Sequence, residues 1–145
     1  MSQFSFWQRW LFVLGVVLAI VGMLAALMCI VTPLGPLNSL VDPIFWGKQA
    51  APDPAVNFSR WIYGVMLATF AGWGALVAFI AHYPFKNKEK WAWNCLLVGT
   101  LVLYLPDTAL SLYFGVIFNA VANTIFLAAV ALPLIFTRRE FQRQA

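Results

Sequence analysis

The fold is decided first by an uncharged apolar stretch near the start of the chain. Residues 10–32 have the sequence WLFVLGVVLAIVGMLAALMCIVT. A helix of about 20 such residues crosses the hydrocarbon core of a bilayer, because each residue adds about 1.5 Å of length. A cleaved signal peptide would have a shorter apolar segment followed by small residues. We therefore expect this segment to be retained as a transmembrane helix.

Three further apolar stretches follow, at about residues 61–82, 91–113 and 116–136. Only 10% of the 145 residues are charged and 63% are hydrophobic, whereas about 25% are charged in a typical soluble domain. So few charges cannot cover the surface of a soluble fold. The sequence therefore predicts an all-α protein, a single integral membrane domain over residues 1–145 built as an antiparallel bundle of four transmembrane helices.

The positive residues predict the orientation of these spans. Most of them precede the first span, join the second to the third, or follow the fourth; they are Arg9, Lys86, Lys88, Lys90, Arg138, Arg139 and Arg143. Lys48 and Arg60 fall on the other side. Because Lys and Arg are enriched in cytoplasmic loops, we expect both termini to be cytoplasmic and the protein to reside in a plasma membrane, the inner membrane of a bacterial cell.

The longest connection covers residues 33–59 and is predicted to lie outside. It contains five prolines, at positions 33, 36, 43, 52 and 54. Proline removes a backbone donor and disfavours a helix interior, so we expect extended and turned backbone rather than another helix. Residues 44–46, with the sequence Ile-Phe-Trp, are predicted to dip into the outer interface as a partial lid.

Small residues mark the faces on which the spans are expected to pack. Gly64, Ala68 and Gly72 recur at four-residue spacing in the second span, and Gly22 with Ala26 does so in the first. In lipid, such residues let helix backbones approach closely. The pattern indicates packing of the first span on the second, or alternatively a homodimer or a docking face for another subunit.

A polar cluster is predicted in the last two spans. Asp107 lies about eight residues before the turn at Gly115 and Asn123 about eight after it, so both sit roughly 12 Å below the outer turn. We expect Asp107 to face the bundle interior and to form a hydrogen bond with Asn119 or Asn123. The candidate ligand-binding residues are Asp107, Thr108, Ser111, Asn119, Asn123 and, as a cation that could pair with the acid, Arg60.

Two interpretations of this cluster remain open. Asp, Asn, Thr and Ser side chains commonly join helices within a membrane. An intramembrane acid is also costly and by default a candidate functional group, so the cluster could instead form an outward-opening pocket for a lipid-like or small apolar ligand with Asp107 as its polar anchor.

Several functions are disfavoured by what the chain lacks. The net charge of +4 is spread between apolar runs rather than gathered on one polar face, so we expect no nucleic-acid binding. Cys29 and Cys95 lie near opposite ends of their spans and should not form a disulfide. His82 is the only histidine. We therefore expect no catalytic motif, no metal site and no cofactor.

Some local motifs resemble those of small four-helix bacterial inner-membrane proteins of uncharacterised function. They are Gly72-Trp73-Gly74, the segment from Pro84-Phe85 to Trp91-Ala92-Trp93, Asp107-Thr108, and Gly115-Val116 with Asn119. This resemblance implies a bacterial inner membrane and no activity. The size and span count are also similar to sterol-isomerase-like and sigma-receptor-like proteins. Those proteins place two acidic residues in a membrane pocket. The predicted spans of this chain contain one acidic residue, Asp107, which argues against isomerase chemistry.

The sequence thus favours a non-enzymatic accessory subunit or binding module with a buried polar cluster in the outer half of the bilayer. Its expected partners are the lipid bilayer and either another membrane protein or further copies of itself. The alternative is a membrane-embedded enzyme or a protein that binds lipids or apolar ligands through Asp107. General acid–base catalysis would want a second positioned group. A small oligomeric transporter is the third hypothesis.

Overall fold

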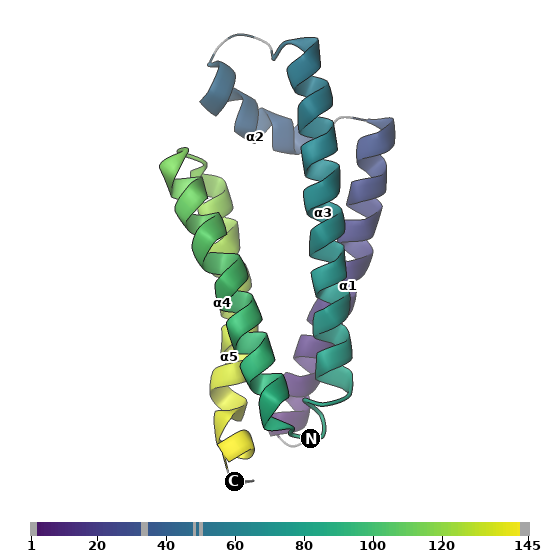
Figure 1. Cartoon of the computed structure of the whole chain (residues 1–145), viewed down its shortest axis with the longest axis vertical. Coiled ribbons are helices and arrows are strands. Elements are labelled where there is room, and N and C mark those ends of the chain that lie inside the picture. The colour runs from purple at the N-terminus through teal and green to yellow at the C-terminus, as the bar shows by residue number, and fades with distance from the viewer. Residues whose placement is uncertain (1–2, 33–34, 48, 50, 143–145) are drawn as a thin grey trace. The chain divides into compact units, whose positions relative to one another are not determined.

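The computed structural model describes residues 3–32, 35–47, 49 and 51–142, and these form helices without any strand. The predicted all-α class is confirmed. The helices are α1 (Gln3–Val31), α2 (Gly35–Trp46), α3 (Asp53–His82), α4 (Lys90–Tyr113) and α5 (Ile117–Gln142) (Figure 1). Lys48 and Arg143, which entered the orientation argument, lie outside the described residues.

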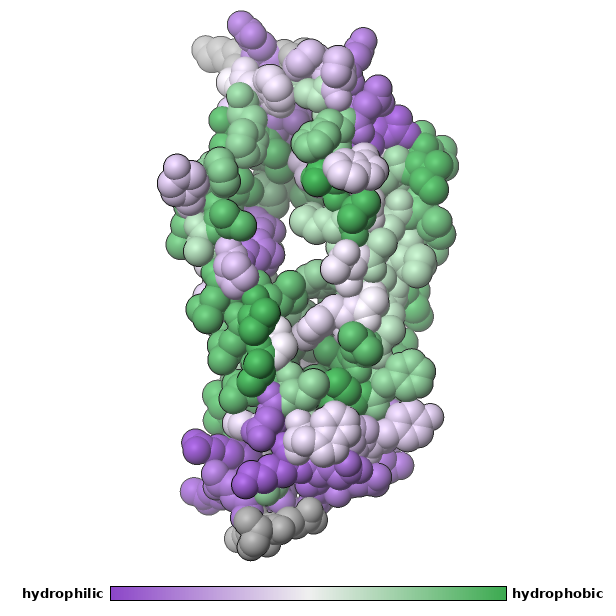
Figure 2. All heavy atoms as spheres, viewed as in Figure 1, coloured by the Kyte–Doolittle hydropathy of each residue, from purple (hydrophilic) through white to green (hydrophobic). Residues whose placement is uncertain are grey.

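The helices α1, α3, α4 and α5 are each long and apolar enough to cross a membrane. Only 17–28% of the residues in their most apolar windows are buried. The middle of the long helices is covered by hydrophobic residues, and hydrophilic residues gather at the helix ends (Figure 2). Contiguous apolar surface on this scale is avoided in water. The chain is therefore a multi-pass membrane protein.

The prediction of a helix-free connection over residues 33–59 is wrong. Residues 35–46 form α2, and α3 begins at Asp53 rather than at residue 61. Two of the five prolines, Pro36 and Pro54, lie in the first turns of these helices, where the missing N–H would have no helical partner anyway. Only Pro43 lies further inside α2. Residues 44–46 form the last turn of α2, and their depth in a membrane stays a prediction.

The early start of α3 has a local cause. The carbonyl oxygen of Pro52 accepts hydrogen bonds from the N–H groups of Ala55 and Val56, at 2.8 and 3.1 Å. Asp53 places a negative charge in the first turn, where it interacts favourably with the positive end of the helix dipole. The helix therefore begins at Asp53, before the apolar segment from residue 61 from which it was predicted.

The chain divides into two compact units. Unit 1 consists of Met1–Val16 and Ala75–Ala145, and unit 2 consists of Val17–Gly74. Helices α1 and α3 contribute residues to both. That the whole chain acts as one membrane domain stays a prediction.

In unit 1, α4 and α5 form the helical hairpin expected from the turn at Gly115. The residue has a φ of 74°, a left-handed conformation that glycine adopts at little cost. The N–H of Val116 donates to the carbonyl oxygen of Ser111 at 2.7 Å and closes the turn. Trp93 ties the two helices together further along, since its indole N–H donates to the carbonyl oxygen of Leu134 at 2.8 Å.

The core of unit 1 contains an aromatic cluster, formed by Phe4, Phe85 and Phe141. Their ring centroids lie 4.7–6.0 Å apart, and Phe85 is 0% exposed. Trp7 stacks on Phe136 beside them, at a centroid distance of 5.1 Å. The start of α1, the loop after α3 and the end of α5 therefore meet at one end of this unit.

Prolines free two carbonyl groups in unit 1, and side chains of α1 occupy both. Pro133 cannot donate to the carbonyl oxygen of Ala129, and the indole N–H of Trp10 donates to it instead at 3.0 Å. Pro84 also has no N–H to donate to the carbonyl oxygen of Ile80, and the N–H of Phe85 donates to it instead. The carbonyl oxygen of Ala81, to which Phe85 would donate in a regular helix, is thereby left free. The carbonyl oxygen of Ala81 accepts from the side-chain amide of Gln8 at 2.9 Å, in a buried position. These bonds anchor the first turns of α1 to α3 and α5.

Candidate functional site

Three of the predicted polar residues form a connected group, which we call the polar clasp: Asp107 and Ser111 on α4 and Asn119 on α5. The Asn119 amide nitrogen donates to Asp107 Oδ1 and to Ser111 Oγ, both at 2.8 Å. An amide NH₂ carries two hydrogens, so both bonds can form together. The Ser111 hydroxyl donates to the backbone carbonyl oxygen of Asp107 at 2.7 Å and lies 3.3 Å from its Oδ1.

The position of the polar clasp follows from the hairpin. Asp107 and Ser111 are one turn apart on α4 and so share a face. Asn119 follows in the first turn of α5, where the tight turn at Gly115 brings it opposite them. Ser111 is buried at 7% exposure. The predicted hydrogen bond between Asp107 and one of the two asparagines is confirmed, and Asn119 is the donor.

The other two predicted residues form a weaker contact. The side-chain amide of Asn123 lies 3.4 Å from the Thr108 hydroxyl oxygen, at the long limit of a hydrogen bond. This contact also joins α4 to α5, one turn further from the connection. It is longer than the bonds of the polar clasp.

The geometry of the polar clasp suits helix joining better than acid–base catalysis. Asn119 and Ser111 hold Asp107 as hydrogen-bond donors, and neither side chain titrates in the ordinary pH range. The second carboxylate oxygen of Asp107, Oδ2, has no hydrogen-bond partner among the described residues. That oxygen could still accept a hydrogen bond from a ligand.

Arg60 has a different role in unit 2. Its Nε donates to the carbonyl oxygen of Cys29 at 3.1 Å and its Nη2 to that of Ile30 at 2.6 Å. Residue 33 lies outside the described residues, but as a proline it has no N–H for the Cys29 carbonyl four positions earlier. The guanidinium therefore caps the last turn of α1, where a cation also complements the helix dipole. Its pairing with Asp107 stays a prediction.

The small residues of α3 differ in how closely they approach α1 within unit 2. A Cβ at Gly64 would lie 3.4 Å from that of Cys29, an ordinary contact with α1. A Cβ at Gly72 would meet nothing within 4 Å in its unit, and Ala68 is exposed. The tightest approach lies at Gly22 on α1, where a Cβ would come within 3.0 Å of the backbone of Leu67 and Ala71.

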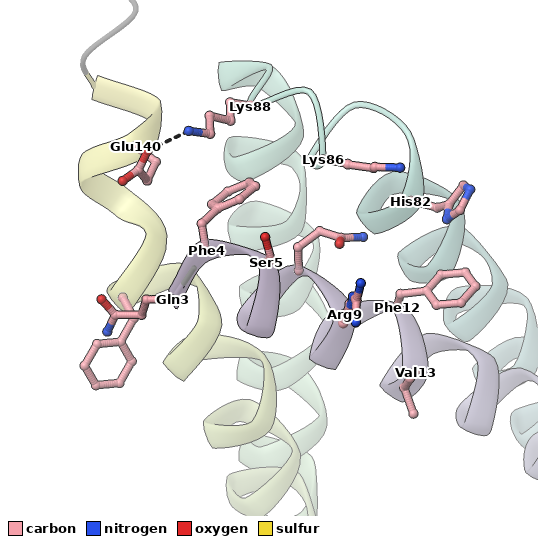
Figure 3. A pocket seen from close by; sticks show the side chains of 12 residues that line it. Gln3, Phe4, Ser5, Arg9, Phe12, Val13, His82, Lys86, Lys88 and Glu140 are labelled. Atoms are coloured by element: carbon pink, nitrogen blue, oxygen red, sulfur yellow. Dashed lines mark hydrogen bonds and ion pairs between the residues drawn. The ribbon is translucent and has the colours of Figure 1, made fainter. Parts of the chain in front are cut away.

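A cleft that the sequence did not predict opens in unit 1. We call it the basic cleft; it has a volume of about 820 Å³. It lies between the start of α1, the end of α3 with its following loop, and the end of α5 (Figure 3). Its polar lining includes Gln8, Arg9, His82, Lys86, Lys88 and Glu140. The three lysines of residues 86–90 could have indicated a basic site, but they were used only to predict the orientation of the spans.

Neither cysteine forms a disulfide: Cys29 is buried and Cys95 exposed, and both are free. His82 contacts the rings of Phe12 and Tyr83, with centroid distances of 5.1 and 4.8 Å. Within the described ranges, no three His, Cys, Asp or Glu side chains come together as metal ligands would.

Comparison with known protein families, curated proteins and solved structures finds no match to this chain.

Proposed function

We propose that this chain is a non-enzymatic accessory subunit or binding module of a bacterial inner membrane. The observation that carries the proposal is the polar clasp. Asp107 is the one acid in the apolar part of the spans, and its Oδ1 accepts hydrogen bonds from neighbours within the same hairpin. Its chemistry is therefore used to join α4 to α5, as expected of polar groups that hold helices together in lipid.

The proposed orientation places both termini in the cytoplasm. Phe4 near the start of α1 and Phe141 near the end of α5 have ring centroids 6.0 Å apart, and Lys88 in the α3–α4 loop pairs with Glu140 at 2.7 Å. The start of α1, the end of α5 and this basic loop therefore lie at one end of unit 1. The enrichment of Lys and Arg at that end supports a cytoplasmic location.

The docking of another membrane helix on α3 is supported by open space beside its small residues. Within unit 2, Ala68 is exposed and a Cβ at Gly72 would meet no neighbour. Transmembrane helices associate at such positions because small side chains let the backbones approach. We propose this face of α3 as the contact for a partner subunit or for a second copy of the chain.

Substitution of Asp107 by Asn tests the non-enzymatic role. We expect Asp107→Asn to leave the abundance and assembly of the protein nearly unchanged, because the amide keeps an oxygen in the place of Oδ1 for Asn119 and Ser111. The lipid profile of cells that carry only the variant should match that of the wild type. A specific lipid that accumulates or disappears, at normal protein abundance, would show that Asp107 acts chemically.

A ligand-binding role is the second candidate, and one observation favours it. Asp107 Oδ2 lacks a hydrogen-bond partner among the described residues, so a small apolar ligand with one donor group could be anchored there. In that case Asp107→Asn would lose a small molecule that copurifies with the wild type, while its abundance stayed normal.

A further inference from the structure

The basic cleft of unit 1 adjoins an apolar groove. The groove has a volume of about 300 Å³ and is lined by Phe12, Val16, Ala78, Phe79, His82 and Tyr83. Phe12 and His82 line both the groove and the cleft, and their rings lie 5.1 Å apart where the two meet. From this point the groove follows α1 and α3 for about one turn. Together they form a surface that is cationic at one end and apolar at the other.

The cleft has an excess of positive charge. Arg9, Lys86 and Lys88 line it with a single carboxylate, that of Glu140. Lys88 donates to Glu140 Oε2 at 2.7 Å and its Nζ lies 4.9 Å from the centre of the Phe4 ring. The charge of Lys88 is thus largely balanced within the protein, and Arg9 and Lys86 add two further positive charges to the lining.

Lys86 projects from a loop that its own backbone holds in place. The N–H groups of Lys88 and Glu89 donate to the carbonyl oxygens of Phe85 and Pro84, both at 2.9 Å. Lys88 has a φ of 60°, which is uncommon for a residue other than glycine. Phe85 anchors the loop in the aromatic cluster. Lys86, His82 and Arg9 lie on one side of the cleft and the Lys88–Glu140 pair on the other (Figure 3).

We propose that the basic cleft and the adjoining groove bind one anionic phospholipid. Its phosphate lies against Lys86 and Arg9, and an acyl chain follows the groove along Phe12 and Phe79. Basic pockets at the ends of transmembrane helices recognise anionic head groups through this charge complementarity. The apolar groove favours a lipid over free phosphate, which has nothing to place there. The proposal does not depend on a partner subunit and is tested with the purified chain.

The test is a titration of the delipidated, detergent-solubilised full chain with phosphatidylglycerol or phosphatidylcholine, followed by native mass spectrometry. The wild type should bind one phosphatidylglycerol at least about tenfold more tightly than phosphatidylcholine. The double variant Arg9→Gln/Lys86→Gln should lose affinity for phosphatidylglycerol on the order of 30-fold. The matched control Lys90→Gln/Arg139→Gln removes the same number of positive charges and should stay within about twofold of the wild type, because neither side chain lines the cleft or the groove.

A second pair of variants guards against misfolding at Arg9. Lys86→Gln alone should weaken binding about fivefold and Lys90→Gln should not. Equal losses in the cleft variants and their controls would show diffuse surface attraction and overturn the proposal, as would equal binding of the two lipids. Inorganic phosphate should fail to displace the lipid at equal phosphate concentration. Displacement would show that the site binds free phosphate, and it would overturn the proposal that it binds a phospholipid.

Discussion

Replacement of Asn119 by Leu is expected to destabilise the α4–α5 hairpin by about 3 kcal/mol. Asn119 donates to both Asp107 Oδ1 and Ser111 Oγ at 2.8 Å, so the variant removes two hydrogen bonds and leaves a carboxyl group with fewer donors in an apolar setting. Each acceptor left unpaired costs about 1–3 kcal/mol, and a charged one costs more. The measurement is the free energy of unfolding in lipid bicelles, obtained by reversible titration with denaturing detergent.

Two comparisons isolate the polar clasp from general effects of an Asn-to-Leu change. Asn123→Leu removes only the 3.4 Å contact to Thr108 and should cost less than about 1 kcal/mol. Asp107→Leu/Asn119→Leu should be more stable than Asn119→Leu alone, since replacement of both partners leaves no unpaired acid. If Asn119→Leu and Asn123→Leu were equally stable, the polar clasp would not hold the hairpin together.

Replacement of Gly22 by Leu is expected to separate α1 from α3 in unit 2, and to cost about 3 kcal/mol relative to the same change at Gly72. Even a Cβ at position 22 would lie 3.0 Å from the Ala71 nitrogen and from the Leu67 carbonyl oxygen. These neighbours are backbone atoms that cannot move aside, so the cost should reach the upper end of the range for overpacked sites.

Gly72→Leu is the matched control for this substitution. Both variants gain the same helix propensity, so that contribution cancels in the comparison of their unfolding free energies. A Cβ at Gly72 has open space in its unit, and this variant should remain as stable as the wild type when purified. In the cell it should nevertheless lose its partner, if the exposed face of α3 docks another helix. Equal destabilisation by the two variants would contradict the packing described for α1 and α3.

Much of the fold could be predicted because lipid imposes simple requirements on the sequence. The four long apolar helices follow from the length and composition of their segments. The α4–α5 hairpin follows from the short connection at Gly115, and this connection places the polar residues of the two helices opposite each other. Equal distance from the turn would pair Asp107 with Asn123, but Asn119 is the observed partner. These features depend on residues that are close along the chain, so counting along a helix is sufficient to bring them together.

Other features could not be predicted because they depend on partners far apart in the sequence. Prolines in residues 33–59 suggested an absence of helix, but Pro36 and Pro54 occupy first turns, where proline is tolerated. Pro133 frees a carbonyl group for Trp10, a donor far away in the sequence. The capping of α1 by Arg60 was also not predicted. No local sequence pattern shows which distant side chain will donate a hydrogen bond to a carbonyl group freed by proline. Nor does it show which lysine will line a cleft.

Native mass spectrometry of the chain, extracted gently from its own membrane, tests the proposed accessory role most directly. The account predicts a defined assembly in which the chain is joined to another membrane polypeptide or to further copies of itself. Bound anionic phospholipid is expected on the chain in any case and does not count as a partner. A lone chain that carries one reproducible small molecule other than a phospholipid would contradict the accessory role and would make Asp107 a ligand-binding group.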